Sequence, residues 1–288
     1  MITGATLMDY RDRYDLKTYF KKRVHKTVIP FFAWSMIGIL CKLALGKIQG
    51  SELSVSYVWN GIFGTTVIPI YWYFQVLFCI YLFMPLFAAV NKKYRKEVFT
   101  YAAVAGFILT GVVPLICNTL LKGYSWGVDP YAFSSYLLFI PAGYLISEYD
   151  IKKNVRRFIY VAGAAGFLMH LAGTYFLSVR AGAVINTFKG YTNAPCIMYS
   201  TGIMVWLKYN YERLSRFRLV RLFQRLIAPY TLSIYLMQYF IYISMLTVFN
   251  IDETSLLYRL GAPFVIIPVI IAATWLIRKI PLIRVIAP

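Results

Sequence analysis

The chain has 288 residues, of which 60% are hydrophobic and 14% charged, and its mean hydropathy of +0.62 excludes a soluble domain with a wet surface. The net charge of +19 is spread between apolar runs, not along one face or tail, which favours membrane topology over nucleic-acid binding. We therefore predict an all-α, polytopic membrane bundle that forms one membrane-embedded domain over residues 1–288.

The chain opens with eight apolar residues, MITGATLM, which are too few to cross a bilayer and are typical of the tail of a helix. A strongly basic stretch follows from Asp9 to Pro30 and carries seven of the thirty Lys and Arg residues. Because short basic loops are retained on the cytoplasmic face, this stretch predicts a cytoplasmic start for all later spans. It also offers a cationic surface to phosphate-bearing ligands from that side.

Eight apolar runs are long enough to cross a membrane. We expect these spans near residues 28–46, 66–90, 98–118, 131–147, 157–178, 191–208, 229–249 and 261–278. Counted with the nearest loop or chain end, the thirty Lys and Arg residues alternate between rich and poor loops, with 24 on one side and 6 on the other. The rich loops between spans are Asn91–Glu97, Glu148–Arg157 and Lys208–Arg225. That partition predicts a multi-pass protein with an even number of spans and both ends in the cytoplasm.

The four cysteines, Cys41, Cys79, Cys117 and Cys196, all fall in apolar stretches without Cys-x-x-Cys spacing or a nearby His, so we expect no metal site. The 25 Tyr, 21 Phe and 6 Trp cluster at span ends, which is typical of interfacial belts. We expect a few of these rings to line a sugar site instead.

Five segments, in order, resemble the acyltransferase family 3 membrane enzymes. They are MITGA, FKKRVHKTVIPFF, YWYFQVLFCIYLFMPLF, FIPAGYLIS and TLSIYLMQYF. The resemblance implies a protein of a bacterial plasma membrane that transfers an acyl group, often acetyl, from cytoplasmic acyl-CoA to a hydroxyl of a surface polysaccharide or lipid-linked sugar. Acyl-CoA would be a co-substrate, with no permanently bound cofactor. Trp72, Tyr235 and Gln238 lie in the matching segments and are expected at the acceptor site.

The chain departs from the family pattern in two places. The family's basic residue, followed after ten others by His on the first helix, has no counterpart here, and we expect that helix and most of the second to be absent. Gln238 stands where the family commonly has His, and an amide cannot take up a proton at neutral pH. The catalytic base is therefore unknown from the sequence.

Two histidines are the candidates for a base. His25 lies between Arg23 and Lys26, and is interpreted more simply as a solvated cation at the membrane edge. His170 lies within a predicted span, where an ionisable group suggests function. It shares a helical face with Ala162, Gly166 and Gly173, however, which favours a small-residue packing seam.

Arg23 and Lys26 repeat the spacing of the family's basic Arg-x-x-Arg motif, with Lys in the second place. One helical turn apart, they are predicted to pair with CoA phosphates, although topology alone would also require basic residues here. Two other functions stay open. One is a glycan or lipid transporter without bond chemistry, and the other is a truncated, non-catalytic relative.

Overall fold

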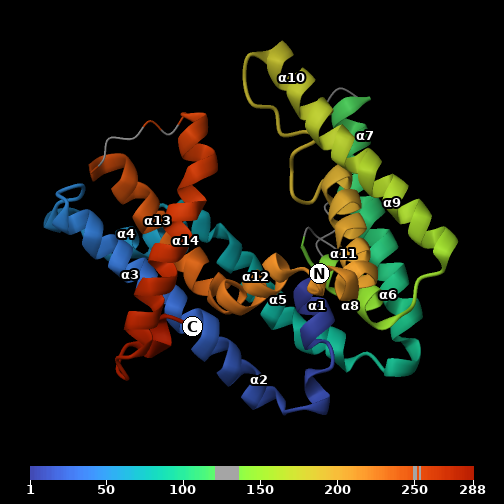
Figure 1. Ribbon diagram of the computed structural model, residues 1–288, viewed down its shortest axis with the longest axis horizontal. Coiled ribbons are helices and arrows are strands. Elements are labelled where there is room, and N and C mark those ends of the chain that lie inside the picture. Colours follow the sequence, from blue (N-terminus) through green and yellow to red (C-terminus); the bar gives the residue numbers. More distant parts are fainter. Residues whose placement is uncertain (121–135, 249–251, 253) are drawn as a thin grey trace. The chain divides into compact units, whose positions relative to one another are not determined.

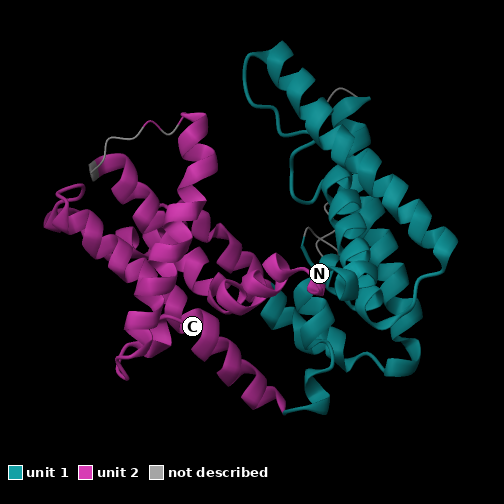
Figure 2. Ribbon diagram, in the orientation of Figure 1, with its two compact units in different colours: residues 1–14, 80–214 teal, residues 15–79, 215–288 magenta. Residues whose placement is uncertain are grey.

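The computed structural model describes residues 1–120, 136–248, 252 and 254–288, and every regular element in these ranges is a helix. The chain forms two compact units, coloured separately in Figure 2. Unit 1 comprises residues 1–14 and 80–214, and unit 2 comprises residues 15–79 and 215–288. Each unit is therefore built from two separate stretches of sequence, and the boundary after residue 79 falls within one helix. The single membrane-embedded domain stays a prediction.

Unit 1 contains most of the middle of the chain (Figure 1). Its helices are α1 (Ile2–Leu7), η1 (Tyr10–Asp12), α6 (Lys92–Gly106), η5 (Phe107–Val112), α7 (Val113–Thr119), α8 (Phe139–Glu148), α9 (Lys153–Leu168), η7 (Met169–Gly173), α10 (Thr174–Ala181) and α11 (Ala194–Ser215, whose last residue belongs to unit 2). Short α1 packs closely on α8, since a Cβ on Gly4 would overlap the Ile140 carbonyl oxygen.

Unit 2 combines the basic N-terminal stretch with the C-terminal helices. Its elements are α2 (Leu16–Arg23), η2 (Val24–Val28), α3 (Ile29–Ala44), η3 (Gly50–Glu52), α4 (Val55–Ile62), η4 (Pro69–Tyr71), α5 (Trp72–Ala89, which continues into unit 1), α12 (Arg218–Leu226), η8 (Ala228–Tyr230), α13 (Thr231–Val248), α14 (Leu256–Arg278) and η9 (Arg284–Ile286). The core of this unit is aromatic and includes the fully buried rings of Phe31, Tyr71 and Phe74.

Six helical rods in the described residues are long and apolar enough to cross a membrane. They are Leu16–Ala44, Pro69–Ala89, Lys92–Thr119, Lys153–Ala181, Arg218–Thr247 and Leu256–Arg278. Their length and composition identify a multi-pass membrane protein, and the all-helical prediction is confirmed.

Six of the eight predicted spans correspond to these rods. The run at 131–147 begins outside the described residues, and its described part forms only the 10-residue α8. The run at 191–208 lies in α11, which has 22 residues but is too polar to count among the six rods. The count of eight spans stays a prediction.

Three of the six rods are interrupted by a π-helical turn, namely η2, η5 and η7. Pro30 follows the first turn and Pro114 the second, and proline has no N–H to continue an α-helical ladder. Both histidines of the chain lie in such turns, His25 in η2 and His170 in η7.

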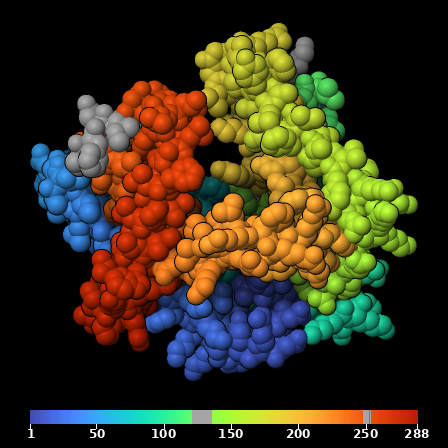
Figure 3. Space-filling view, viewed as in Figure 1, coloured from blue at the N-terminus to red at the C-terminus, as the bar shows by residue number. Residues whose placement is uncertain are grey.

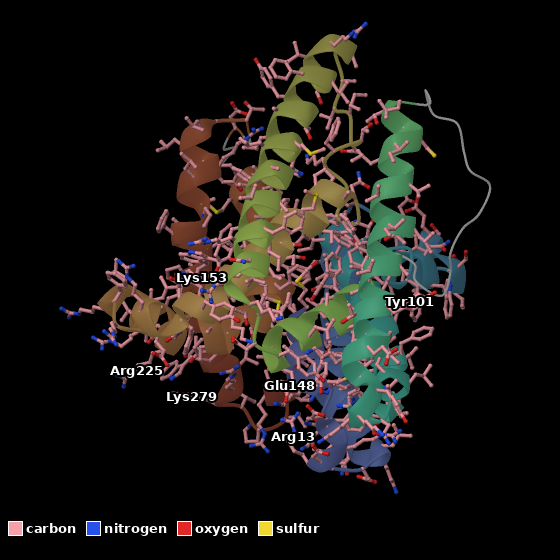
Figure 4. All side chains as sticks on the ribbon, turned by 90° about the vertical axis from the view of Figure 1, so that its right-hand side faces the viewer. Arg13, Tyr101, Glu148, Lys153, Arg225 and Lys279 are labelled. Carbon is pink, nitrogen blue, oxygen red and sulfur yellow. The ribbon has the colours of Figure 1, made fainter. Side chains whose placement is uncertain are left out.

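The basic stretch at 208–225, expected to be a loop, is instead mostly helical, because α11 extends to Ser215 and α12 begins at Arg218. In α12, Leu219 and Phe223 recur on one face while Arg218, Arg221 and Arg225 recur on another. All five side chains are exposed, and the helix forms part of the orange surface in Figure 3. Figure 4 shows Arg225 projecting outward from it.

Candidate functional site

Residues 16–30 of the basic stretch form the first half of the Leu16–Ala44 rod. Asp15 begins the rod as its N-cap, and its carboxylate accepts a 3.2 Å hydrogen bond from the Thr18 backbone N–H. Hydrogen bonding by Thr18 holds the pKa of Asp15 below its ordinary value of 3.8. The predicted cationic surface is therefore a capped helix, continuous with the apolar span behind it.

Arg23 and Lys26 differ in their surroundings. The Arg23 side chain is half-buried, with its Cζ atom 5.8 Å from the centre of the Tyr19 ring, whereas Lys26 is exposed. The π-helical turn begins directly after Arg23. A π-helical turn contains more residues than an α-helical turn, so each residue advances by a smaller angle around the helix axis. Over the three residues from Arg23 to Lys26, the chain therefore completes less of a full turn. The two side chains point further apart around the axis than they would in an α-helix.

His25 lies on the same turn and is exposed. Arg23 and Lys26 lie close to it in sequence, and within the described part of the chain its ring has no hydrogen bond, ion pair or aromatic contact. The structure thus places an exposed His25 between the two predicted phosphate-binding residues along the helix.

His170 belongs to unit 1, whereas the other candidate residues belong to unit 2. Its Nδ1 atom lies 3.1 Å from the Phe188 carbonyl oxygen, and its ring lies 5.5 Å from the Tyr199 ring. A carbonyl oxygen can only accept, so Nδ1 carries the proton and Nε2 has the free lone pair. This tautomer can accept a proton at Nε2.

The face that His170 shares with two glycines is closely packed, as the sequence predicts. A Cβ on Gly166 would lie 2.7 Å from the Pro195 carbonyl oxygen, and one on Gly173 would lie 2.6 Å from the Phe188 ring. The imidazole bonds the segment that leads into α11, however, and not a neighbouring helix. Half-buried His170 therefore has both a packing role and a proton-accepting atom.

An aromatic cluster in unit 2 joins the start of α3 to α5 and α13. The Phe31 ring lies 5.6, 5.1 and 5.2 Å from the rings of Tyr71, Phe74 and Phe78. The Phe74 ring lies 5.5 Å from that of Tyr235. Stacked rings of this kind bury large apolar areas in fixed relative orientations, so the cluster sets the spacing of the three helices.

Two tyrosine hydroxyls fix α13 against the start of α5. The Tyr71 hydroxyl donates a 2.7 Å hydrogen bond to the Leu236 carbonyl, and the Tyr235 hydroxyl donates to the Ile70 carbonyl. Tyr235 is thus held by its hydroxyl, and its ring centre lies 5.6 Å from that of Tyr73.

The three predicted acceptor residues lie around this joint. Trp72 is half-buried, and its ring meets that of Tyr73 edge-on at 6.3 Å. Tyr73, which is 41% exposed, contacts both Trp72 and Tyr235. Gln238 is half-buried one turn beyond Tyr235 on α13. The structure therefore brings segments 165 residues apart in sequence into one aromatic surface. It also adds Tyr73 to this surface, a residue that the sequence analysis does not predict at the acceptor site.

Within the described ranges, no group of three or more His, Cys, Asp or Glu side chains could hold a metal ion. Cys41 and Cys79 are exposed while Cys117 and Cys196 are buried, and all four are free thiols. The chemistry available from the candidate residues therefore consists of cations, aromatic rings, one amide and two imidazoles.

Comparison with known proteins gave one family. No curated protein and no solved structure matches the chain. A family model described as an acyltransferase domain (Acyl_transf_3) matches residues 1–278, which is nearly the whole chain and includes all the candidate residues above. The chain belongs to acyltransferase family 3.

Proposed function

We propose that this membrane acyltransferase moves an acyl group, specifically acetyl, from cytoplasmic acyl-CoA to a hydroxyl of a surface polysaccharide or lipid-linked sugar. The family match over residues 1–278 is the observation that carries the proposal. We further infer a bacterial plasma membrane with both ends of the chain on the cytoplasmic side, as the partition of basic residues among the loops predicts.

The donor side of the proposal rests on the basic start of the Leu16–Ala44 rod. CoA carries phosphates, and the half-buried Arg23 presents a guanidinium that can form two parallel hydrogen bonds to one phosphate. Exposed Lys26 adds a second cation nearby in sequence, with a flexible side chain that reaches into solvent. Because their side chains diverge at the π-helical turn, we assign them to different phosphate groups of CoA.

The acceptor side rests on the aromatic surface at the α5–α13 joint. Ring faces there can stack on a pyranose, and the Tyr73 ring is exposed while that of Trp72 is half-buried. The Tyr235 hydroxyl is already engaged with the Ile70 carbonyl, so we assign Tyr235 a contribution through its ring. The Gln238 amide can donate to and accept from sugar hydroxyls, although it cannot act as a base.

The reaction requires one proton transfer. The acceptor hydroxyl oxygen attacks the thioester carbonyl carbon, the carbon–sulfur bond breaks, and the hydroxyl proton passes through a base to the departing thiolate. His170 is one candidate, because its Nδ1–H is held by the Phe188 carbonyl and its Nε2 can accept. His25 is the second candidate by its place beside the predicted CoA residues.

The test is a reconstitution of the 288-residue protein in lipid vesicles with acetyl-CoA inside and a polysaccharide repeat unit outside. Release of CoA thiol that requires the sugar, together with sugar esterification, is the expected result. Movement of the sugar across the vesicle without CoA release would favour a transporter instead. Acetyl-CoA binding without ester formation would identify a non-catalytic relative.

Two sets of variants assign the residues. His170→Gln and His25→Gln should each be compared with the unchanged protein, and loss of a general base lowers the rate about 10²–10⁴-fold. A loss in neither variant would exclude both histidines as the base. Arg23→Gln with Lys26→Gln should raise the KM for acetyl-CoA with little change in kcat, and Lys152→Gln with Lys153→Gln is the charge-matched control.

A further inference from the structure

Unit 2 contains a cavity that the acyl-transfer proposal does not use. It lies between the end of α3, residues 67–68 and the second half of α13, and has a volume of about 240 Å³. Its walls are largely apolar and include Ile68, Phe240 and Ile243. Two lysines, Lys42 and Lys47, also line it.

The end of α3 explains why both lysines reach the same cavity. Gly46 adopts a positive φ of 65°, and it donates its N–H to the Leu43 carbonyl at 3.0 Å. The Lys47 N–H donates to the Lys42 carbonyl at 2.9 Å. These two bonds form a Schellman motif, which folds the chain back so that Lys47 returns beside Lys42. The motif also satisfies the last carbonyls of the helix, so neither ammonium group is needed to cap them.

The two ammonium groups are short of partners. Lys42 is half-buried, and its one hydrogen bond within the described ranges is a long one, 3.4 Å to the Thr66 carbonyl. An ammonium group has three donors. Within the described part of the chain, neither Lys42 nor Lys47 forms a salt bridge with a carboxylate. Two adjacent cations at an apolar cavity repel each other and favour an anion between them.

We propose that this cavity binds a phosphate-bearing anionic phospholipid, with its phosphate between Lys42 and Lys47 and part of one acyl chain against Phe240 and Ile243. The position along the helix fits this ligand. Lys42 stands in the last turn of the apolar rod Leu16–Ala44, where a membrane-spanning helix meets the headgroup layer, and the apolar wall continues from there along α13. The inference does not depend on the proposed acyl transfer.

The size of the cavity favours a lipid over a water-soluble organic anion. Pockets for small molecules are typically about 300–1,000 Å³ and enclose most of the ligand. A cavity of about 240 Å³ holds only part of a chain, which suits a lipid whose remainder lies in the bilayer. Free phosphate would use the lysines and leave the apolar walls unoccupied.

The experiment measures lipid binding to the purified protein in an uncharged detergent by native mass spectrometry. The probes are dioleoyl phosphatidylglycerol, dioleoyl phosphatidylcholine and inorganic phosphate. A basic residue near the headgroup layer adds about fivefold in affinity, so two should give phosphatidylglycerol a preference of roughly 25-fold. Lys42→Gln with Lys47→Gln should abolish this preference, whereas Lys152→Gln with Lys153→Gln should retain it.

Cys41 gives a second readout, because it is exposed and lines the cavity. Phosphatidylglycerol should slow its reaction with a thiol reagent in the unchanged protein and leave Cys79, the other exposed cysteine, unaffected. Ile243→Trp should fill the apolar part and weaken protection even with both lysines present. That variant separates the chain-binding contribution from the charge contribution, and its thermal unfolding midpoint checks that it folds.

Three outcomes would overturn the proposal. The first is equal retention of the two lipids by the unchanged protein. The second is an unchanged preference in the Lys42 and Lys47 double variant. The third is complete displacement of phosphatidylglycerol by inorganic phosphate at equal concentration, which would assign the site to a free phosphate anion.

Discussion

A guanidinium nitrogen of Arg95 lies 2.6 Å from Asp9 Oδ1, which joins α6 to the short segment after α1 across 86 residues of sequence. The rest of the guanidinium is also occupied. It donates to the carbonyls of Val90 and Ala88 at 2.9 and 3.0 Å, and its Cζ atom stands 5.4 Å from the centre of the Tyr144 ring. Arg95 is therefore a structural anchor inside unit 1, with only 4% of its side chain exposed.

Replacing Arg95 with Ala should lower the free energy of unfolding by roughly 3 kcal/mol, the lower end of the cost of breaking a buried ion pair, because Asp9 is partly exposed. Asp9→Asn should cost less, on the order of 1 kcal/mol, since the two carbonyl contacts remain. Thermal unfolding in detergent measures both. Exposed Lys93→Ala is the matched control, and a loss in that control as large as in Arg95→Ala would contradict the anchor.

The burial of Arg95 could not be predicted from the sequence. The basic sequence at 91–97 predicts an exposed cytoplasmic loop, and most of its cations are exposed, although α6 already begins at Lys92. Nothing local indicates that one arginine turns inward, because its partners Asp9 and Tyr144 are 86 and 49 residues away. Apolar run length, by contrast, is a local property, and it locates the six spans well.

The candidate site was likewise only partly predictable from the sequence. Short motifs indicate its residues, but the π-helical turns at both histidines and the hydrogen bond between Tyr71 and Leu236 depend on tertiary packing. The Lys42 and Lys47 pair carried a local signal, since a glycine just after the end of an apolar helix predicts a reversal of the chain.

The small-residue crossing of α9 and α11 should be sensitive to one methyl group. A Cβ on Gly166 would approach the Pro195 carbonyl oxygen to 2.7 Å, so Gly166→Ala should destabilise the protein by about 1–3 kcal/mol. Gly261→Ala is the control, because a Cβ there meets nothing within 4 Å. It should be neutral or stabilising by up to about 1 kcal/mol, since alanine is the better helix former. Similar unfolding midpoints for the two variants would contradict close packing at Gly166.

The hydrogen bond between Tyr209 and Asp150, in the loop before α9, should make the stability of the protein depend on pH in the acidic range. The Tyr209 hydroxyl donates a 2.6 Å hydrogen bond to Asp150 Oδ1, and this bond holds the pKa of Asp150 below 3.8. A lowered folded-state pKa contributes stability that is present above pH 3.8 and is lost as the pH falls through the folded value. Tyr209→Phe should therefore reduce the change in unfolding temperature between about pH 5 and pH 3. An unchanged pH profile in Tyr209→Phe would show that the bond contributes nothing to stability.

The proposed topology can be checked by labelling cysteines at exposed positions. In a background where Cys41 and Cys79 are Ser, Lys93→Cys and Arg218→Cys should react only from the cytoplasmic side. Val184→Cys should react only from the opposite side, because its loop is poor in Lys and Arg. Labelling of Lys93→Cys and Val184→Cys from the same side would refute the arrangement.

The ring and the hydroxyl of Tyr235 should have separate roles, the ring in sugar binding and the hydroxyl in stability. Tyr235→Phe should keep the KM for the sugar close to that of the unchanged protein, because the ring contacts with Tyr73 and Phe74 persist. The lost bond to the Ile70 carbonyl should cost about 0.5–1.5 kcal/mol of stability. Tyr235→Leu removes the ring as well, and should raise the KM for the sugar several-fold while the KM for acetyl-CoA stays constant. Steady-state kinetics with each substrate varied in turn measure both constants.

Two further variants show whether this effect belongs to the aromatic surface. Trp72→Leu should also raise the KM for the sugar, because it changes the neighbouring ring on α5. Leu232→Met, at a half-buried position one turn before Tyr235 on α13, is the matched control for a change of side-chain shape on that helix and should leave both constants unchanged. A KM for acetyl-CoA that rises together with the KM for the sugar would place Tyr235 on the donor side. An unchanged sugar KM in Tyr235→Leu would remove that ring from the acceptor site, since the variant retains an apolar side chain but has no face on which a pyranose can stack.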